Sequence, residues 1–155
     1  MSSTTKTETQ FRLEDFFKGT FYSTGRIYNR KRDLMREFIV RGHATYRKDT
    51  LILEEDFEYS DGDTDHRIWQ ILCLASGRYE GHTHGLVGKA PVTAPVGTKL
   101  NWTYRLKLPV RNLNLTFRFL DNMELSNNRV INTAQIKWMG LTVLHLEQEF
   151  FQGTP

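Results

Sequence analysis

The sequence predicts an all-β protein: a closed, antiparallel, up-and-down barrel of about eight to ten strands with a short N-terminal helix. Hydrophobic residues alternate with polar ones at a period of two, and short turn sequences separate the alternating segments. Antiparallel strands with such short connections must hide their edges, and closure into a barrel does so. The clearest alternation places on one face Leu100, Trp102, Tyr104, Leu106 and Leu108, then Leu113, Leu115, Phe117 and Phe119.

A chain of 155 residues with 12% aromatic and 25% charged residues is typical of one globular domain rather than of a disordered protein. We expect residues 11–155 to form a single barrel domain after a flexible polar tail at residues 1–10. The tail has no apolar signal core, and no segment has the composition of a membrane helix. We therefore expect a cytoplasmic protein without an integral membrane segment.

The basic residues gather in one place, because five of the eleven residues from Arg26 to Arg36 are Arg or Lys. We interpret this stretch as a solvated loop rather than a phosphate or membrane patch, since no aromatic stacking motif accompanies it. No nucleic-acid partner is expected. Cys73 is the single cysteine of the chain, which excludes an internal disulfide and a multi-thiolate metal site. It lies in an apolar run and is interpreted as an inert buried thiol.

In the first half of the chain, residues 12–17 predict a short helix whose Leu13, Phe16 and Phe17 plug one end of the barrel. The strands that follow are predicted at residues 19–28, 37–47, 51–59, 63–74 and 78–86. Between the third and the fourth, residues 60–62 form a three-residue hairpin loop with Gly62 at the positive-φ position.

In the second half, residues 88–97 contain two of the four prolines and no periodicity, so we predict a loop. Two long strands at residues 99–108 and 113–119 come next, joined by a turn at Pro109–Arg111. The remaining strands are expected near residues 123–125, 130–138 and 141–151, with a turn at residues 126–129.

One carboxylate falls on the apolar face of the third strand. Glu55 shares that face with Leu53 and Phe57, whereas the other acidic residues of the strand alternate to the outside. The three-residue loop sets Glu55 opposite Arg67 of the fourth strand. We favour a structural ion pair that fixes the strand register, because an unpaired buried carboxylate is costly. The alternative is a charged element at the cavity floor that orients a polar group of a ligand.

His82 and His84 lie two residues apart on the fifth strand, on one face with Glu80. Two imidazoles and a carboxylate are a set of metal ligands found in proteins. The inward set of this strand is, however, expected to be residues 79, 81 and 83, which turns the histidines to solvent. We therefore predict no metal site.

Asp121 has the same parity as the apolar residues 113–119, so it can enter the interior at the barrel rim as a general base or a hydrogen-bond acceptor. We favour a role in capping a turn at Asp121–Asn122. The chain contains no glycine-rich phosphate loop, no G-x-S-x-G, no H-E-x-x-H and no dinucleotide-binding fingerprint. Their absence argues against nucleotide chemistry and metallohydrolysis, and no cofactor is expected.

Several motifs carry a resemblance to a known family. The specific block is L-x-E-x-F-x-Y-S-D-G at residues 53–62, followed by R-x-W at residues 67–69. The motifs F-x-L-E-D-F-F-x-G at residues 11–19, Y-x-G at residues 79–81 and W-x-Y-x-L-x-L-P at residues 102–109, with the segment 132–140, extend it over almost the whole chain. Together they resemble the proteobacterial family catalogued as domain of unknown function 3833.

That resemblance implies a lipocalin-like β-barrel with no established biochemical activity. Many members resemble lipoproteins with an N-terminal export signal, and we expect no such signal in this chain. Two positions depart from the family pattern: His84 stands where an acid is usual, and residues 120–123 replace an Asp-Asp-Trp-Met-like run. If those positions line the pocket, this member is expected to bind something different.

The sequence thus predicts lipocalin-like binding of a small, mostly apolar, lipid- or polyketide-like molecule in the barrel interior. The candidate ligand-binding residues are Tyr59, Arg67, Trp69, Trp102, Tyr104, Phe117, Phe119 and His84. The alternative is a cofactor-independent isomerase or cyclase that acts on such a molecule with Glu55 or Asp121 as the acid–base group. A third option is a structural or partner-binding domain with a filled barrel. The oligomeric state is left open.

Overall fold

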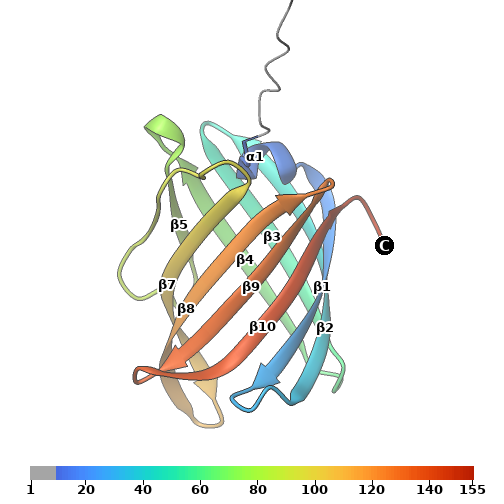
Figure 1. The fold of residues 1–155 in the computed structure, drawn as a ribbon, viewed down its shortest axis with the longest axis vertical. Coiled ribbons are helices and arrows are strands. Elements are labelled where there is room, and N and C mark those ends of the chain that lie inside the picture. The colour runs from blue at the N-terminus through green and yellow to red at the C-terminus, as the bar shows by residue number, and fades with distance from the viewer. Residues whose placement is uncertain (1–9) are drawn as a thin grey trace, which may run out of the picture.

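Ten antiparallel strands form one sheet in the computed structural model, which describes residues 10–155 (Figure 1). The strands are β1 (Gly19–Asn29), β2 (Leu34–Arg47), β3 (Thr50–Tyr59), β4 (Thr64–Cys73), β5 (Tyr79–Thr83), β6 (Ala90–Val92), β7 (Lys99–Val110), β8 (Leu113–Ser126), β9 (Arg129–Trp138) and β10 (Leu141–Gln152). The helix α1 (Leu13–Phe16) precedes β1, and the short turn η1 (Ala75–Gly77) precedes β5. No helix of the described residues is long and apolar enough to cross a membrane. The expected tail lies outside the described residues apart from Gln10.

The sheet curls into a nearly closed barrel. Its strand order is β6-β5-β4-β3-β2-β1-β10-β9-β8-β7, so the first strand of the chain pairs with the last. The two remaining edges meet beside β7, where the N–H of Lys107 donates to the Gly85 carbonyl at 2.7 Å and the N–H of Val87 donates to the Arg105 carbonyl at 2.9 Å. These bonds satisfy backbone groups that an open edge leaves unpaired. The predicted all-β, up-and-down barrel with a short N-terminal helix is confirmed.

The alternation of side chains decides what lies inside. In β7, Leu100, Trp102 and Leu106 are buried, while the polar residues between them are exposed. The register predicted from the three-residue loop is also correct, because Glu55 of β3 lies opposite Arg67 of β4. Period-two patterning therefore predicts the interior residues of β7 and the pairing of β3 with β4 correctly.

Glycines make room for large rings inside the barrel. A Cβ atom at Gly42 would overlap the ring of Phe21, its partner across the β1–β2 ladder. A Cβ atom at Gly81 of β5 would overlap the indole of Trp102. These rings can lie against the inner wall because a residue without a side chain stands beneath each of them.

One end of the barrel is closed by α1, as predicted. Leu13, Phe16 and Phe17 are buried there. The hydroxyl of Tyr79 in β5 accepts from the N–H of Leu13 at 3.1 Å and donates to the Glu14 carboxylate at 2.7 Å. Burial and the hydrogen bond to Glu14 raise the pKa of Tyr79, so it stays neutral and fastens the helix to the barrel wall.

Three local expectations are wrong. The predicted loop at residues 88–97 contains β6, which is too short to show periodicity and which includes Pro91. The strand β8 runs without a break through Asp121 and Asn122, so the expected turn there does not exist. The strand β5 ends at Thr83 rather than Leu86, because Gly85 adopts a φ of 84° and turns the chain.

Cys73 is half-buried rather than fully enclosed. Burial and the nearby Glu14 carboxylate raise the pKa of its thiol to about 11. A thiol with a raised pKa carries little thiolate at neutral pH and is a poor nucleophile, in keeping with the expected inert role.

Candidate functional site

A cavity of about 220 Å³ lies inside the barrel. Its walls are mostly aromatic and aliphatic, and they come from eight strands as well as from α1 and the residue that follows it. The polar side chains in these walls are Glu55, Tyr59, Asp65, Arg67, Tyr104, Asp121, Asn132 and Gln148. A largely apolar hollow with a few polar groups is typical of a small-molecule site.

The cavity opens at the end of the barrel opposite α1. In β1, Phe21 near α1 is 1% exposed, whereas Ile27 near the other end is half-buried. In β7, Leu100 near α1 is 1% exposed, and Leu108 at the far end is again half-buried. Ile27 and Leu108 both line the cavity, so its mouth lies between the turns at the lower end of Figure 1.

Glu55 lies in the cavity wall and is buried, with 6% of the residue's surface exposed. The guanidinium of Arg67 turns instead toward β5, where Nη1 donates to Thr83 Oγ1 at 3.1 Å and to the His84 carbonyl at 2.9 Å. The expected ion pair is therefore absent, and no other described residue pairs with the Glu55 carboxylate. Burial raises the pKa of Glu55 to about 7, with Arg67 opposing this shift and Asp121 adding to it.

Asp121 is the second buried carboxylate of the cavity, at 7% exposure. It lies opposite Trp102 in the β7–β8 ladder, and Tyr104 donates its hydroxyl hydrogen to Oδ2 at 2.8 Å. Burial raises the pKa of Asp121 to about 7, although the hydrogen bond from Tyr104 lowers it. The expected turn-capping role is wrong, and the interior position is the correct one.

Hydrogen-bonding capacity remains unused in this wall. Within residues 10–155, Asp121 Oδ1, Asn132 Oδ1 and Trp102 Nε1 are buried and have no partner. A buried polar atom without a partner costs about 1–3 kcal/mol. The wall therefore offers two acceptors and one donor, beside the carboxylate of Glu55, to a polar group inside the cavity.

Aromatic rings form a continuous surface around these groups. The ring centroids of Trp69 and Trp102 are 4.9 Å apart, and those of Trp102 and Tyr104 are 5.5 Å apart. Phe119 stacks on Tyr104 with a centroid distance of 5.1 Å. Nearer the mouth, Tyr59 stacks on Phe57, and the guanidinium of Arg36 lies over the Tyr59 ring at 3.7 Å. Such a surface suits a flat apolar molecule.

The cavity brings together six of the eight candidate ligand-binding residues, namely Tyr59, Arg67, Trp69, Trp102, Tyr104 and Phe119. Phe117 is half-buried and lies outside the lining. His84 is exposed on the outer surface. Its backbone carbonyl accepts a hydrogen bond from Arg67, and this is its only contact with the candidate residues. His82 is exposed as well. In the described part of the chain, no group of three or more His, Cys, Asp or Glu side chains is placed to hold a metal ion.

Sequence reasoning missed Asn132 and Gln148, which are buried at 3% and 8%. The two-residue alternation of the strands could have identified both. Asn132 shares the inward face of β9 with Val130 and Ala134, and Gln148 lies between the inward positions 146 and 150 of β10. Gln148 donates to Ser23 Oγ at 2.9 Å, so part of its capacity is already used.

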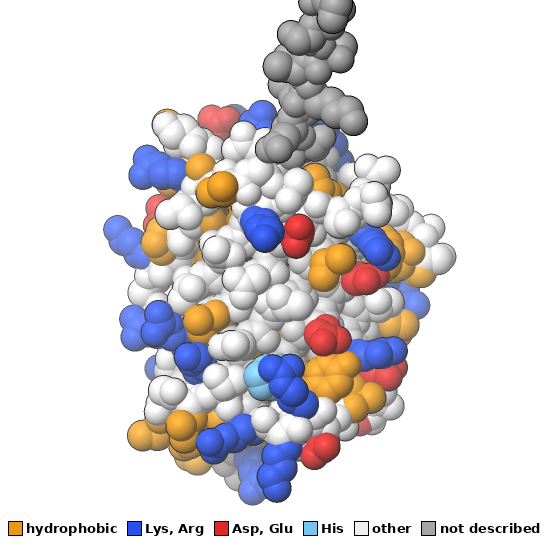
Figure 2. Space-filling model, in the orientation of Figure 1, with side chains coloured by type: hydrophobic (Ala, Val, Ile, Leu, Met, Phe, Trp, Pro, Cys, Tyr) orange, Lys and Arg blue, Asp and Glu red, His pale blue; other side chains and the backbone are white. Residues whose placement is uncertain are grey.

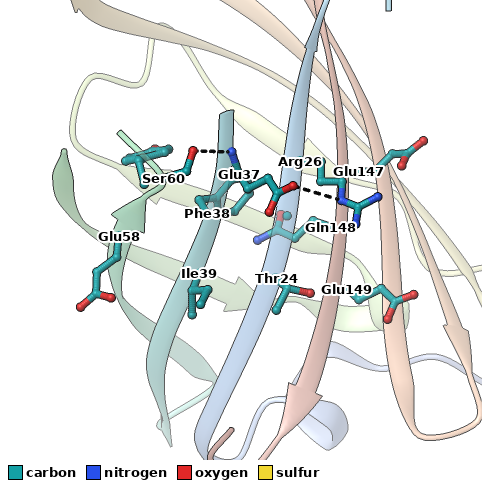
Figure 3. Close-up of a pocket in the computed structure, with 12 residues that line it drawn as sticks. Thr24, Arg26, Glu37, Phe38, Ile39, Glu58, Ser60, Glu147, Gln148 and Glu149 are labelled. Atoms are coloured by element: carbon teal, nitrogen blue, oxygen red, sulfur yellow. Dashed lines mark hydrogen bonds and ion pairs between the residues drawn. The ribbon is translucent and has the colours of Figure 1, made fainter. Parts of the chain in front are cut away.

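A larger hollow of about 650 Å³ lies over the outer wall where β10, β1, β2 and β3 run side by side (Figure 3). Exposed charges of its lining have ion-pair partners. Arg26 Nε lies 3.9 Å from Glu37 Oε1, and Glu58 Oε2 lies 3.0 Å from Nη1 of Arg41, which is outside the lining. Exposed pairs of this kind satisfy each other and contribute little. The interior cavity, with its unpaired buried groups, is therefore the candidate site.

Comparisons with known proteins agree with the fold. A family model described as "Protein of unknown function (DUF3833)" matches residues 1–151. No curated protein matches the chain. The S-type phycobiliprotein lyase CPES from Guillardia theta is similar in structure, with a TM-score of 0.63 at 8% identity over 99% of this chain and 100% of that one. This likeness shows a lipocalin-like barrel.

Two further solved structures are similar at lower TM-scores. The redesigned β-barrel mFAP1, bound to DFHBI, has a TM-score of 0.47 at 12% identity, over 92% of this chain and 100% of that one. The ywiB protein from Bacillus subtilis has a TM-score of 0.40 at 12% identity, over 87% of this chain and 91% of that one.

Proposed function

Because this chain belongs to the family described as protein of unknown function (DUF3833), its own cavity is the guide to its activity, and we propose that it binds a small, mostly apolar molecule inside the barrel. The aromatic surface formed by Trp69, Trp102, Tyr104 and Phe119 provides the affinity. The polar residues at the floor orient the molecule.

One observation carries this proposal: buried polar groups without partners face an apolar hollow that opens at one end of the barrel. A filled structural core would pair these groups or replace them by apolar residues. Asp121 Oδ1 and Asn132 Oδ1 instead have no partner among the described residues, and Glu55, which lines the same cavity, is only 6% exposed. The barrel interior is therefore better suited to a ligand than to a purely structural role.

The unpaired atoms also indicate the polar part of the ligand. Most of them are carboxyl or amide oxygens, which accept hydrogen bonds when the carboxyl groups are ionised. A ligand group with N–H or O–H donors, such as an amine or a hydroxyl, satisfies these oxygens. The proposed ligand is thus an amphiphile with an apolar body and a donor group that enters first.

The test is a fluorescence titration with N-phenyl-1-naphthylamine, an apolar probe with one N–H group whose emission rises in apolar surroundings. We expect saturable binding of one probe per chain. The variant Leu108→Trp places a large ring in the mouth, where Leu108 is half-buried and lines the cavity. It should weaken binding about tenfold or more, because losing about 1.4 kcal/mol of contact energy has this effect.

The matched control is Leu113→Trp, which adds the same ring to the same hairpin at a position that is 65% exposed and outside the cavity. This variant should bind the probe like the wild type. Equal affinity of the wild type and Leu108→Trp would show that the probe does not enter the cavity, and the proposal would be wrong.

A cofactor-independent isomerase or cyclase is the second candidate, because Glu55 and Asp121 both have a pKa of about 7 inside the cavity. A carboxyl group with a pKa near the operating pH is suited to acid–base catalysis. Mass spectrometry of molecules that copurify with the wild type and with Glu55→Gln separates the two functions. The same molecule in both indicates binding, whereas an unconverted precursor held only by the variant indicates catalysis.

A further inference from the structure

Four turns lie at the end of the barrel opposite α1, where the cavity opens (Figure 1). They connect β1 to β2, β3 to β4, β7 to β8 and β9 to β10, and the β3–β4 turn differs from the other three in charge. We define the open rim as residues 30–35, 107–113 and 137–141. Its composition differs from the rest of the surface in two respects, and neither is explained by the binding of a ligand inside the barrel.

The first respect is exposed apolar surface. Of the thirteen large hydrophobic side chains that are exposed in the described structure, seven belong to the open rim. The most exposed are Met139 at 80%, Leu113 at 65% and Met35 at 58%, one from each turn of the open rim. Trp138, at 37%, lies beside Met139. Apolar side chains gathered at one end mark an interaction surface rather than random exposure.

The second respect is charge. The open rim contains six basic residues and one acidic residue. Arg30, Lys31 and Arg32 belong to the first turn, and the second and third turns contribute Lys107, Arg111 and Lys137. The one acid is Asp33.

The β3–β4 turn at the same end is acidic, and Arg36 compensates one of its charges by pairing with both Asp61 and Asp63. Arg36 Nη2 lies 2.8 Å from Asp61 Oδ2 and 3.2 Å from Asp63 Oδ2. Figure 2 shows hydrophobic and basic side chains side by side along the lower edge of the molecule, where these turns lie in Figure 1. With Arg36, Asp61, Asp63 and Asp65 included, this end of the barrel has seven basic and four acidic residues, so it is apolar and has a net positive charge.

We propose that the open rim docks on the surface of a bilayer that contains anionic phospholipids. The apolar tips enter the headgroup boundary, and the Arg and Lys side chains beside them contact lipid phosphates. The charge favours this occupant over a second copy of the chain, because two open rims of the same sign repel each other. In this orientation the cavity mouth faces the membrane, so an apolar molecule passes between bilayer and barrel without crossing water.

This inference goes beyond the proposed ligand binding and depends on the rim alone. The sequence alone favours a solvated loop around Arg30–Arg32, because no aromatic stacking motif accompanies it. The fold adds exposed apolar and aromatic side chains to this stretch, since it brings Leu113, Trp138 and Met139 to the same end.

The test uses Trp138 as an internal reporter. It is the exposed member of the three tryptophans, whereas Trp69 and Trp102 are buried in the barrel. The protein is titrated with vesicles of phosphatidylcholine alone and with vesicles of phosphatidylcholine and phosphatidylglycerol, and bound protein is measured by flotation. We expect binding to the mixed vesicles at low salt, a shift of the Trp138 emission to shorter wavelength, and loss of binding as the salt concentration rises.

Two rim variants and one control complete the experiment. Lys31→Glu combined with Arg111→Glu should lower the partition to mixed vesicles about tenfold or more, because each basic residue near an anionic surface contributes about 1 kcal/mol. Leu113→Ser combined with Met139→Ser should abolish the emission shift. The control at the α1 end is Val96→Ser, which removes the same kind of exposed side chain (82%) and should leave binding unchanged.

Several results would overturn the inference. They are the absence of binding to either vesicle, equal binding to both vesicles, and a loss of binding in Val96→Ser as large as in the rim variants. Concentration-dependent dimerisation that the rim variants abolish would assign the surface to a second copy instead. Probe binding by the wild type in solution is independent of all these outcomes, so the failure of docking is distinguishable from failure of the proposed function.

Discussion

The hydroxyl of Tyr104 donates a 2.8 Å hydrogen bond to the carboxylate of Asp121 inside the barrel, and this bond is the only partner that the described residues give Asp121. Removing it with Tyr104→Phe leaves a buried carboxylate with no donor at all. We expect this variant to lower the free energy of unfolding by about 1–3 kcal/mol, measured by urea denaturation.

The control for this change is Tyr28→Phe. Tyr28 also donates to a carboxylate, that of Glu147 at 3.3 Å, but on the exposed surface. Because water replaces a lost surface hydrogen bond, the control should change the stability by less than about 0.5 kcal/mol. Equal effects of the two variants would show that Asp121 is not buried as described.

The stability of the protein should depend on Glu55 in a defined pH window. Burial raises the pKa of Glu55 to about 7 in the folded protein from 4.5, so the folded state binds its proton more tightly than the unfolded state does. The contribution of the neutral Glu55 carboxyl group to the free energy of unfolding is fully present below pH 4.5 and is lost as the pH rises toward 7. The free energy of unfolding should therefore fall across this window.

The difference between the wild type and Glu55→Gln isolates this effect from other carboxyl groups, among them Asp61, whose pKa is lowered and whose contribution has the opposite sign. The stability of the wild type relative to the variant should fall by about 3 kcal/mol between pH 4 and pH 8 and then level off. A difference that stays constant, or that rises with pH, would show that Glu55 is solvated or firmly paired.

The contact between Gly81 and Trp102 predicts a coupled pair. Gly81→Ala should lower the free energy of unfolding by about 1–3 kcal/mol, because the new methyl group overlaps the indole ring. In a Trp102→Leu background the same substitution should cost much less, since the ring is gone. Strictly additive effects in this double-mutant cycle, measured by chemical denaturation, would contradict the packing described here.

The barrel could be predicted because its long strands obey a strict alternation. In β7 the alternation decided which side chains are inside, and the loop that contains Gly62 set the register that places Glu55 opposite Arg67. Both are local properties of the chain. The plug of α1 was also predictable from a local feature, since three apolar side chains, Leu13, Phe16 and Phe17, fall within one short segment and are buried.

The pairing of side chains could not be predicted in this way. The guanidinium of Arg67 turns to Thr83 and to the carbonyl of His84, and this depends on how β5 lies beside β4 rather than on the β3–β4 register. The sequence favours a turn at Asp121–Asn122, because Asp and Asn are common in turns, yet the pairing of β8 with both neighbours keeps the strand continuous. Tertiary contacts overrode local preference in both cases.

A crystal structure of the protein grown with N-phenyl-1-naphthylamine tests the proposed function most directly. The account predicts one probe molecule in the interior, with its rings between Trp102 and Phe119 and its N–H directed at the carboxylate of Asp121 or Glu55. A probe found only on the outer wall, or an interior that side chains fill completely in the presence of saturating probe, would contradict it.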